Sequence, residues 1–132
     1  MWTYNGIVFE DRESWVSFVY LITNLVNDRK YIGKKGFTFA KTKQVKGKKK
    51  RFKIESDWKD YYGSSEELKA EVEKFGEKAF RREIIRLCKS KGEASYFEAK
   101  EQFVRNVLET DEYYNSWISC RIRKSHLTFL KS

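Results

Sequence analysis

The sequence predicts an α/β domain of the α+β type, in which helices flank a small, mostly antiparallel sheet of three strands. Three observations support this fold class: a strand pair joined by a tight turn at residues 18–35, a third strand-like segment at residues 80–87, and two helical patterns that alternate with it. The 132 residues are 40% hydrophobic and 17% aromatic. This is sufficient for one compact domain, residues 1–132, with its own core.

The first two strands form a predicted hairpin. Residues 18–24 alternate along the chain and are rich in β-branched and aromatic side chains, and residues 29–35 follow after an Asn-Asp turn. The antiparallel register expected from this turn places Tyr20 opposite Gly33. Tyr20 and Tyr31 then lie diagonally on one face, close enough to share a ligand, whereas a shift of one residue would separate them.

Capping residues and hydrophobic spacing predict the other elements. Ser64 and Glu67 have the spacing of a capping box, and Gly76 stands where a helix C-cap glycine belongs. Residues 113–130 are compatible with either a strand or a short helix. In order, we expect a short strand at 6–9, the hairpin at 17–35, a long basic loop at 36–53, a short helix capped by Ser56, a helix at 64–75, a strand at 80–87 and a helix at 93–108.

Positive charge is concentrated in one segment. The chain has 28 Lys and Arg against 19 Asp and Glu, a formal charge of +9, and residues 41–53 contain eight basic residues and no acid. Such a block gains free energy by neutralising phosphates, so we expect it to contact nucleic acid, either as a mobile loop or as one that orders on DNA. An anionic membrane is less favoured, because the block has no apolar face. The expected nucleic-acid contacts are Lys34, Lys35, Lys41, Lys43, Lys46, Lys48, Lys49, Lys50, Arg51 and Lys53.

Other features of the sequence indicate the compartment. No apolar run approaches 18 residues, and the chain does not start with the basic and then apolar segments of a secretory signal. Cys88 and Cys120 match no metal-binding spacing, so we expect both to be reduced thiols of a cytoplasmic protein that does not act on a membrane.

A carboxylate lies at the centre of the apolar face predicted for the last helix. Ala94, Phe97, Glu101, Val104 and Leu108 follow a 3-4-3-4 spacing and therefore share one face. A charge in this position is costly unless it is paired or bound to a metal, and carboxylate oxygen is the ligand that Mg²⁺ prefers beside a phosphate. We therefore expect Glu101 to hold a metal ion, with a salt bridge to a lysine as the alternative.

Glu98 is the second candidate for the metal ligand. By the 100° rotation per residue of a helix, it lies about 60° from Glu101, toward solvent.

Two strings in the hairpin, Phe18-Val-Tyr20 and Tyr31-Ile-Gly33, resemble the signature of the GIY-YIG nuclease family. Residues 58–65 add a similarity to the phage-encoded Seg-type homing endonucleases, and the resemblance covers roughly residues 17–115. Phe18 stands where the family has a glycine, at a structural position. In the family a helix glutamate precedes a Tyr-Asn pair, and Glu101 with Tyr114-Asn115 resembles that pattern.

The resemblance implies an endonuclease that uses Mg²⁺, or another divalent ion such as Mn²⁺, to hydrolyse DNA by in-line attack of water. Tyr20 would be the general base or a relay to it, and Tyr31 would orient the water or the phosphate. Glu101 would hold the metal ion and Asn115 would be a supporting polar group. Tyr61 would supply the hydroxyl that the family places after the hairpin, with plain packing as the alternative role.

Two further expectations concern positive charge near the site. A tyrosine acts as a base only if nearby cations stabilise its phenolate, and Lys34, Lys35 and the basic segment could do so. Asp57 stands where the family usually has an arginine, so the cation for the developing phosphorane charge must come from elsewhere. Arg51 is the first candidate, followed by Lys35 and Lys59.

The missing arginine supports an alternative function, a non-catalytic DNA- or RNA-binding module on a degenerate nuclease fold. For the enzyme, the resemblance implies DNA as the partner and the cytoplasm of a phage-infected bacterium as the location. The sequence shows no obvious second DNA-recognition domain, so site choice is expected to depend on this domain, on a dimer on DNA or on a targeting partner.

Overall fold

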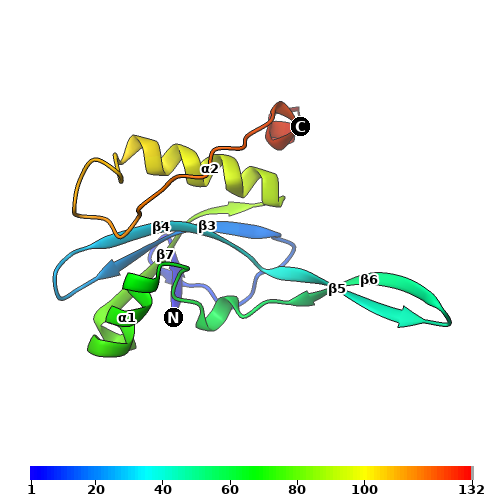
Figure 1. The fold of residues 1–132 in the computed structure, drawn as a ribbon, viewed down its shortest axis with the longest axis horizontal. Coiled ribbons are helices and arrows are strands. Elements are labelled where there is room, and N and C mark those ends of the chain that lie inside the picture. The colour runs from blue at the N-terminus through cyan, green and yellow to red at the C-terminus, as the bar shows by residue number, and fades with distance from the viewer. Residues whose placement is uncertain (132) are drawn as a thin grey trace.

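The protein consists of a sheet with helices on both faces and a long two-stranded arm. The computed structural model describes residues 1–131, with side chains up to residue 127. A five-stranded sheet of order β2-β1-β7-β3-β4 forms the body, and β5 and β6 form a separate ribbon that projects from it (Figure 1). The elements are β1 (Trp2–Tyr4), β2 (Ile7–Val8), β3 (Ser17–Asn24), β4 (Lys30–Gly36), β5 (Thr38–Val45), β6 (Lys48–Glu55), the 3-10 turn η1 (Trp58–Asp60), α1 (Glu66–Phe75), η2 (Glu77–Ala79), β7 (Phe80–Cys88), α2 (Lys91–Val104) and η3 (Lys124–Lys131).

The sheet separates two apolar clusters. Alternation along β3 sends Phe18, Tyr20 and Ile22 to one face, where they pack with Trp58 and Leu68. A second cluster, on the face covered by α2, contains Val19, Ile32, Cys88, Ala94 and Val107. Figure 1 shows α2 and α1 on opposite sides of the sheet. None of the helices in the described part of the chain is long and apolar enough to cross a membrane.

The predicted hairpin is confirmed with its register. β3 and β4 are antiparallel, Tyr20 pairs with Gly33, and Ile22 pairs with Tyr31. The backbone N–H of Asn24 donates to the carbonyl of Arg29 at 2.8 Å, which closes the turn. The predicted third strand is also confirmed, as β7, which pairs antiparallel with β3.

The expectation of only three strands is wrong, because the N-terminal residues extend the sheet. β1 pairs parallel with β7, and β2, within the expected short strand, pairs antiparallel with β1. Trp2 is 2% exposed, and its indole N–H donates to the carbonyl of Trp58 at 2.6 Å. One buried aromatic residue thus fixes a strand that is too short to show a repeating pattern in the sequence.

The expectation of a long basic loop at 36–53 is also wrong. β5 and β6 pair over eight residues each, from Thr38 opposite Glu55 to Val45 opposite Lys48. The turn between them is Lys46-Gly47, and both residues have positive φ, 50° and 75°, as a two-residue hairpin turn requires. The alternation of Thr, Phe, Val and Ile with lysine was concealed by the density of charge.

Helix α1 starts and ends close to the predicted residues. Ser65 caps α1 by accepting from the N–H of Leu68, one residue later than the capping box indicates, and Gly76 ends the helix as expected. The short helix is the 3-10 turn η1, and the hydroxyl of Ser56 donates to the carbonyl of Gly36 at 2.6 Å instead of capping it. The C-terminal stretch forms the 3-10 segment η3.

The buried face predicted for α2 is wrong. The helix ends at Val104, and Val104 and Leu108 are 70% and 50% exposed. Of the predicted face Ala94 is buried as expected, and the other buried positions of the helix are Glu93, Ala99 and Gln102. The helix is therefore rotated, and Glu98 rather than Glu101 lies toward β4.

Candidate active site

A cavity of about 730 Å³ opens beside the edge strand β4. It combines residues from β4, from the segment before α1, from α2 and from the chain after α2. Those used below are Tyr31, Lys34, Ser64, Glu98, Gln102 and Asn115.

Three tyrosines form a connected cluster at this edge. Tyr20 is 1% exposed, and its ring centroid lies 6.2 Å from that of Tyr31 and 6.0 Å from that of Tyr61. The hydroxyl of Tyr20 hydrogen-bonds to Tyr61, and the hydroxyl of Tyr31 shares a 2.8 Å hydrogen bond with Ser64 Oγ. The structure therefore brings together the three tyrosines selected from the sequence, with Tyr31 at the cavity and Tyr20 behind it.

Gly33 makes room for the Tyr20 hydroxyl. A Cβ atom at this position would lie 2.3 Å from Tyr20 Oη and 2.5 Å from its Cζ. These separations are far below van der Waals contact, so any side chain at residue 33 would displace the Tyr20 ring.

We expect Gly33→Ala to disable the site. Because Tyr20 is fully enclosed, the added methyl group should lower the free energy of unfolding by about 1–3 kcal/mol and reduce cleavage more than it reduces DNA binding. Thermal denaturation and a plasmid-cleavage assay would measure both effects. An unchanged melting temperature and rate would mean that the tyrosine cluster can rearrange without cost.

The environment keeps the two hairpin tyrosines protonated. Burial raises the pKa of Tyr20 well above its usual value of 10.0, and the neighbouring Tyr61 and Tyr31 raise this pKa further. Burial also raises the pKa of Tyr31, against an opposing effect of its hydrogen bond with Ser64. The expectation that the basic segment stabilises a Tyr20 phenolate is not supported, because that segment forms the projecting arm.

Glu98 is the half-buried carboxylate among the three that line the cavity, and the other two, Glu66 and Glu67, are exposed. Burial raises the pKa of Glu98, whereas the charge of Lys34 and a hydrogen bond from the Lys34 backbone N–H oppose that increase in pKa. Glu98 lines the cavity together with Tyr31, and its charge makes a small contribution that raises the pKa values of Tyr20 and Tyr31.

Glu101 lies outside this arrangement. Its Oε2 atom is 3.0 Å from Nε of Arg105, and its side chain is 38% exposed. This ion pair corresponds to the salt-bridge alternative, with an arginine in place of a lysine. Glu98, and not Glu101, lines the cavity with Tyr31.

Two lysines of β4 place positive charge on either side of the site. Lys34 Nζ lies 2.5 Å from Ser95 Oγ on α2. Lys35 Nζ lies 2.7 Å from Asp57 Oδ1 and 4.1 Å from the centre of the Tyr61 ring. Asp57, at the position where the family usually has arginine, therefore holds a lysine beside Tyr61.

The other two cation candidates are not brought to the tyrosines. Arg51 pairs across the arm with Thr42, four residues from the arm's base, and its side chain is exposed. Lys59 Nζ lies 5.6 Å from the centre of the Trp58 ring and lines a different pocket. The expectation that Arg51 supplies the catalytic cation therefore does not agree with its place in this structure.

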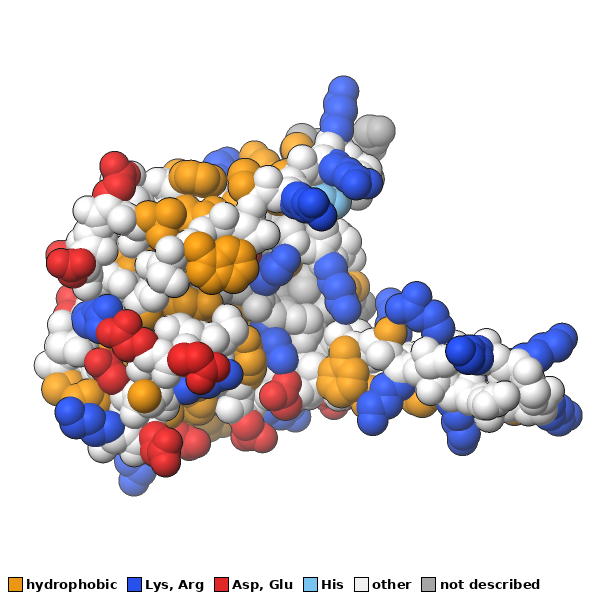
Figure 2. Space-filling view, viewed as in Figure 1, with side chains coloured by type: hydrophobic (Ala, Val, Ile, Leu, Met, Phe, Trp, Pro, Cys, Tyr) orange, Lys and Arg blue, Asp and Glu red, His pale blue; other side chains and the backbone are white. Residues whose placement is uncertain are grey.

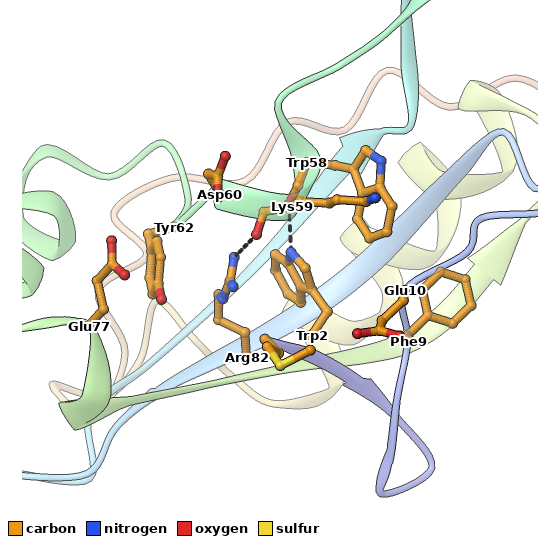
Figure 3. A pocket seen from close by; sticks show the side chains of 10 residues that line it. Trp2, Phe9, Glu10, Trp58, Lys59, Asp60, Tyr62, Glu77 and Arg82 are labelled. Carbon is orange, nitrogen blue, oxygen red and sulfur yellow. Dashed lines mark hydrogen bonds between the residues drawn. The ribbon is translucent and has the colours of Figure 1, made fainter.

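Arg82 holds the segment that carries Tyr61. Its guanidinium lies between the rings of Trp2 and Tyr62, at 4.7 and 4.2 Å from their centres (Figure 3). Its Nη1 atom donates to the carbonyl oxygens of Lys59 and Tyr61 at 3.0 and 2.9 Å. The sequence did not indicate this role for Arg82, because β7 also contains Arg81, Glu83 and Arg86 and only the folded structure shows which of them is buried.

Asn115 and Gln102 fix the backbone of β4 next to Tyr31. Asn115 accepts from the N–H of Ile32 at 3.1 Å and donates to its carbonyl at 2.8 Å, and Gln102 Nε2 donates to the same carbonyl at 3.0 Å. Because β4 is an edge strand, these side chains satisfy groups that no further strand covers. Asn115 lies at the site as expected. Gln102 was not selected, although it follows Glu98 by one helical turn.

The residues present fit a hydrated divalent ion that also binds the substrate phosphate. The described residues contain no grouping of three or more His, Cys, Asp or Glu side chains that could hold a metal. Mg²⁺ typically keeps several waters and takes one or two carboxylates together with phosphate oxygens. The half-buried carboxylate of Glu98 could supply such a ligand, at a polar cavity that the exposed Glu66 and Glu67 also line.

Comparison with known proteins agrees with this architecture. A family model described as "Putative endonuclease segE, GIY-YIG domain" matches residues 2–118. The chain is 31% identical over 99 residues to "Putative endonuclease segE" of Enterobacteria phage T4. That match covers 74% of this chain and 39% of the relative, so the chain spans about two-fifths of the relative's length. No solved structure matches the chain. The chain belongs to the SegE GIY-YIG domain family.

Proposed function

We propose that this protein is a divalent-metal-dependent endonuclease that hydrolyses phosphodiester bonds in DNA. The observation that carries the proposal is the meeting of Tyr31 and Glu98 at one cavity, with Tyr20, Tyr61 and Lys35 directly behind it. Family membership supports the same reaction.

The proposed roles follow from where each group lies. Tyr31 reaches the cavity with a hydroxyl that is already hydrogen-bonded, so it can orient the attacking water or a phosphate oxygen. Tyr20 has a raised pKa and hydrogen-bonds to Tyr61, so it passes a proton instead of holding a negative charge. Glu98 would hold Mg²⁺ or Mn²⁺, which supplies positive charge at the scissile phosphate when bound.

Lys35 replaces the missing arginine in this proposal. It lies on the same face of β4 as Tyr31, because residues two and four apart in a strand share a face. Asp57 anchors its ammonium group beside Tyr61. A cation in this place can stabilise negative charge that develops on the phosphorane.

A plasmid-cleavage assay tests the proposed function. Incubation with Mg²⁺ or Mn²⁺ should convert supercoiled plasmid to nicked or linear DNA, and EDTA should prevent the conversion. DNA binding without cleavage under any divalent ion would overturn the enzyme proposal and favour a binding module on the same fold.

The similarity to a phage protein supports a homing-type role in the cytoplasm of an infected bacterium. We propose that a dimer on DNA, or a targeting partner, assists the choice of site. Mixing experiments with a cleavage-inactive variant would reveal a dimer, because inactive subunits would lower double-strand cutting more than nicking.

The arm should bind phosphates of the DNA backbone. Replacing Lys48, Lys49 and Lys50 with alanine should reduce the slope of log K against log[salt] by about 0.9 for each phosphate that is no longer neutralised, because fewer counterions are released. A matched variant that removes Lys69, Lys74 and Lys78 from the α1 region has the same net charge. Equal slopes for the two variants would show that the arm has no special role in binding the phosphate backbone.

A further inference from the structure

The arm has two chemically different faces. Side chains alternate along each strand, and directly opposite residues point to the same side. The Phe52 face consists of Phe39, Lys41, Lys43, Val45, Lys48, Lys50, Phe52 and Ile54. The Arg51 face consists of Ala40, Thr42, Gln44, Lys49, Arg51 and Lys53, between the end residues Thr38 and Glu55.

The Arg51 face has the groups that read base edges. Arginine and lysine donate to guanine O6 and N7, glutamine pairs with adenine N6 and N7, and threonine bonds to either kind of edge. On this face Thr42 lies opposite Arg51, and Gln44 lies opposite Lys49. All four side chains are exposed, and the structure gives them no hydrogen bond or ion pair. The Phe52 face offers only apolar groups and lysines.

We propose that the arm enters the major groove of duplex DNA and that its Arg51 face reads the base sequence there. The inference rests on the proposed DNA substrate and assigns to this domain a means of choosing its site. The lysines of the Phe52 face then lie outward, where they can contact the phosphates of the groove walls. Figure 2 shows Lys and Arg side chains along the arm, and residues 41–53 contain no acid.

The dimensions agree with this placement. The major groove is about 12 Å wide and admits a two-stranded ribbon. Successive pairs on one face are two residues apart, about 6.7 Å, which equals the rise of about two base pairs. Ala40–Lys53, Thr42–Arg51 and Gln44–Lys49 are three successive pairs. Together they would read about four to five base pairs.

Both faces meet the body at the base of the arm. Phe39 on the Phe52 face and Thr38 at the end of the Arg51 face line one hollow with Lys34 and Lys91. Beyond this base, the side chains of Thr42, Gln44, Lys49 and Arg51 are exposed, so they are accessible to a groove.

The arm also limits the distance between reading and cutting. Thr42 follows Tyr31 by eleven residues, which span at most about 37 Å even if fully extended. At 3.4 Å per base pair, the cut should lie within about eleven base pairs of the centre of the read sequence.

Selection of binding sites tests the inference without requiring cleavage. The wild-type protein would be incubated in EDTA with a library of random-sequence duplexes, and the bound DNA would be sequenced. We expect enrichment of a motif of about four to five base pairs that includes at least one guanine. The preference for this motif over a scrambled duplex should fall about 5- to 150-fold when one side chain can no longer bond to its base.

Two variants of equal design separate the faces. Thr42→Val with Gln44→Met keeps size and charge but removes hydrogen-bonding groups, and it should lose the preference while the salt dependence is retained. Lys43→Met with Lys50→Met, on the Phe52 face, should keep the preference and weaken the salt dependence. Replacing the motif's guanines with 7-deazaguanine, which lacks N7 in the major groove, should reduce wild-type binding to the level of a scrambled duplex.

Three results would overturn the inference: no enriched motif, a motif retained by the Thr42/Gln44 variant, or full binding to the 7-deazaguanine duplex. Because selection takes place in EDTA, these results do not depend on catalysis. Failure of the selected duplex to be cut with Mg²⁺ would contradict the proposed endonuclease function and leave the proposed reading of DNA intact.

Discussion

Glu98→Gln is expected to abolish metal-dependent cleavage, with a loss of about 100-fold or more in rate, and to leave DNA binding largely intact. Glu98 is a half-buried carboxylate that lines the cavity with Tyr31, and its charge raises the pKa values of both hairpin tyrosines. Removing the proposed metal ligand should forfeit several kcal/mol of charge stabilisation in the transition state. Plasmid cleavage under single-turnover conditions, together with binding in EDTA, would separate the two effects.

Glu101→Gln is the matched control on the same helix. Glu101 pairs with Arg105 in a partly exposed position, so its loss should change the rate less than about threefold and cost at most about 0.5 kcal/mol of stability. If Glu101→Gln abolished cleavage and Glu98→Gln did not, the assignment from geometry would be wrong and the expectation from the sequence would be correct.

The Glu98→Gln substitution also has an expected signature in stability. Burial raises the folded-state pKa of Glu98 above the value near 4.3 of an unfolded chain. Between those two pKa values the folded protein binds more protons than the unfolded one, so stability falls as pH rises through this window. Without divalent ions, Glu98→Gln should therefore match or exceed the wild-type melting temperature at neutral pH, and this advantage should disappear at acid pH.

Local patterns predicted the parts of the fold that local interactions determine. The hairpin register followed from the alternation of side chains along residues 18–24 and from the turn at residues 25–28. It correctly placed Tyr20 and Tyr31 on one face. The end of α1 at Gly76 followed from a backbone conformation that glycine adopts easily. In each case the prediction depends only on a few residues that are neighbours in the sequence.

The features that the sequence did not predict depend on distant packing. The rotation of α2 is set by Ala99 and Gln102 against β4, and a 3-4 spacing of larger apolar residues pointed to the wrong face. The arm was not predicted because the eight basic residues at 41–53 indicated a loop, although β-branched and aromatic residues typical of strands are interspersed with them. Arg82 and Lys35 acquire their roles through partners more than twenty residues away, Lys59 and Asp57, respectively.

Tyr20→Phe is expected to reduce cleavage by about 100-fold or more, within the range usual for loss of a proton-transfer group. The substitution keeps the ring that packs against Trp2 and Tyr31, and it removes only the hydroxyl that hydrogen-bonds to Tyr61. The melting temperature should change little, because one buried hydrogen bond contributes about 1 kcal/mol and the phenyl ring brings no new polar group. Tyr4→Phe, which also loses one hydroxyl on a strand of the same sheet, is the control and should cleave normally.

If Tyr20→Phe cut DNA at the wild-type rate, Tyr20 would be a core residue only, and the proton path from Tyr31 to Tyr61 would have to bypass it. If Tyr31→Phe alone lost activity, the hydroxyl at the cavity would carry the reaction, and Tyr20 would serve only to hold that ring against Gly33.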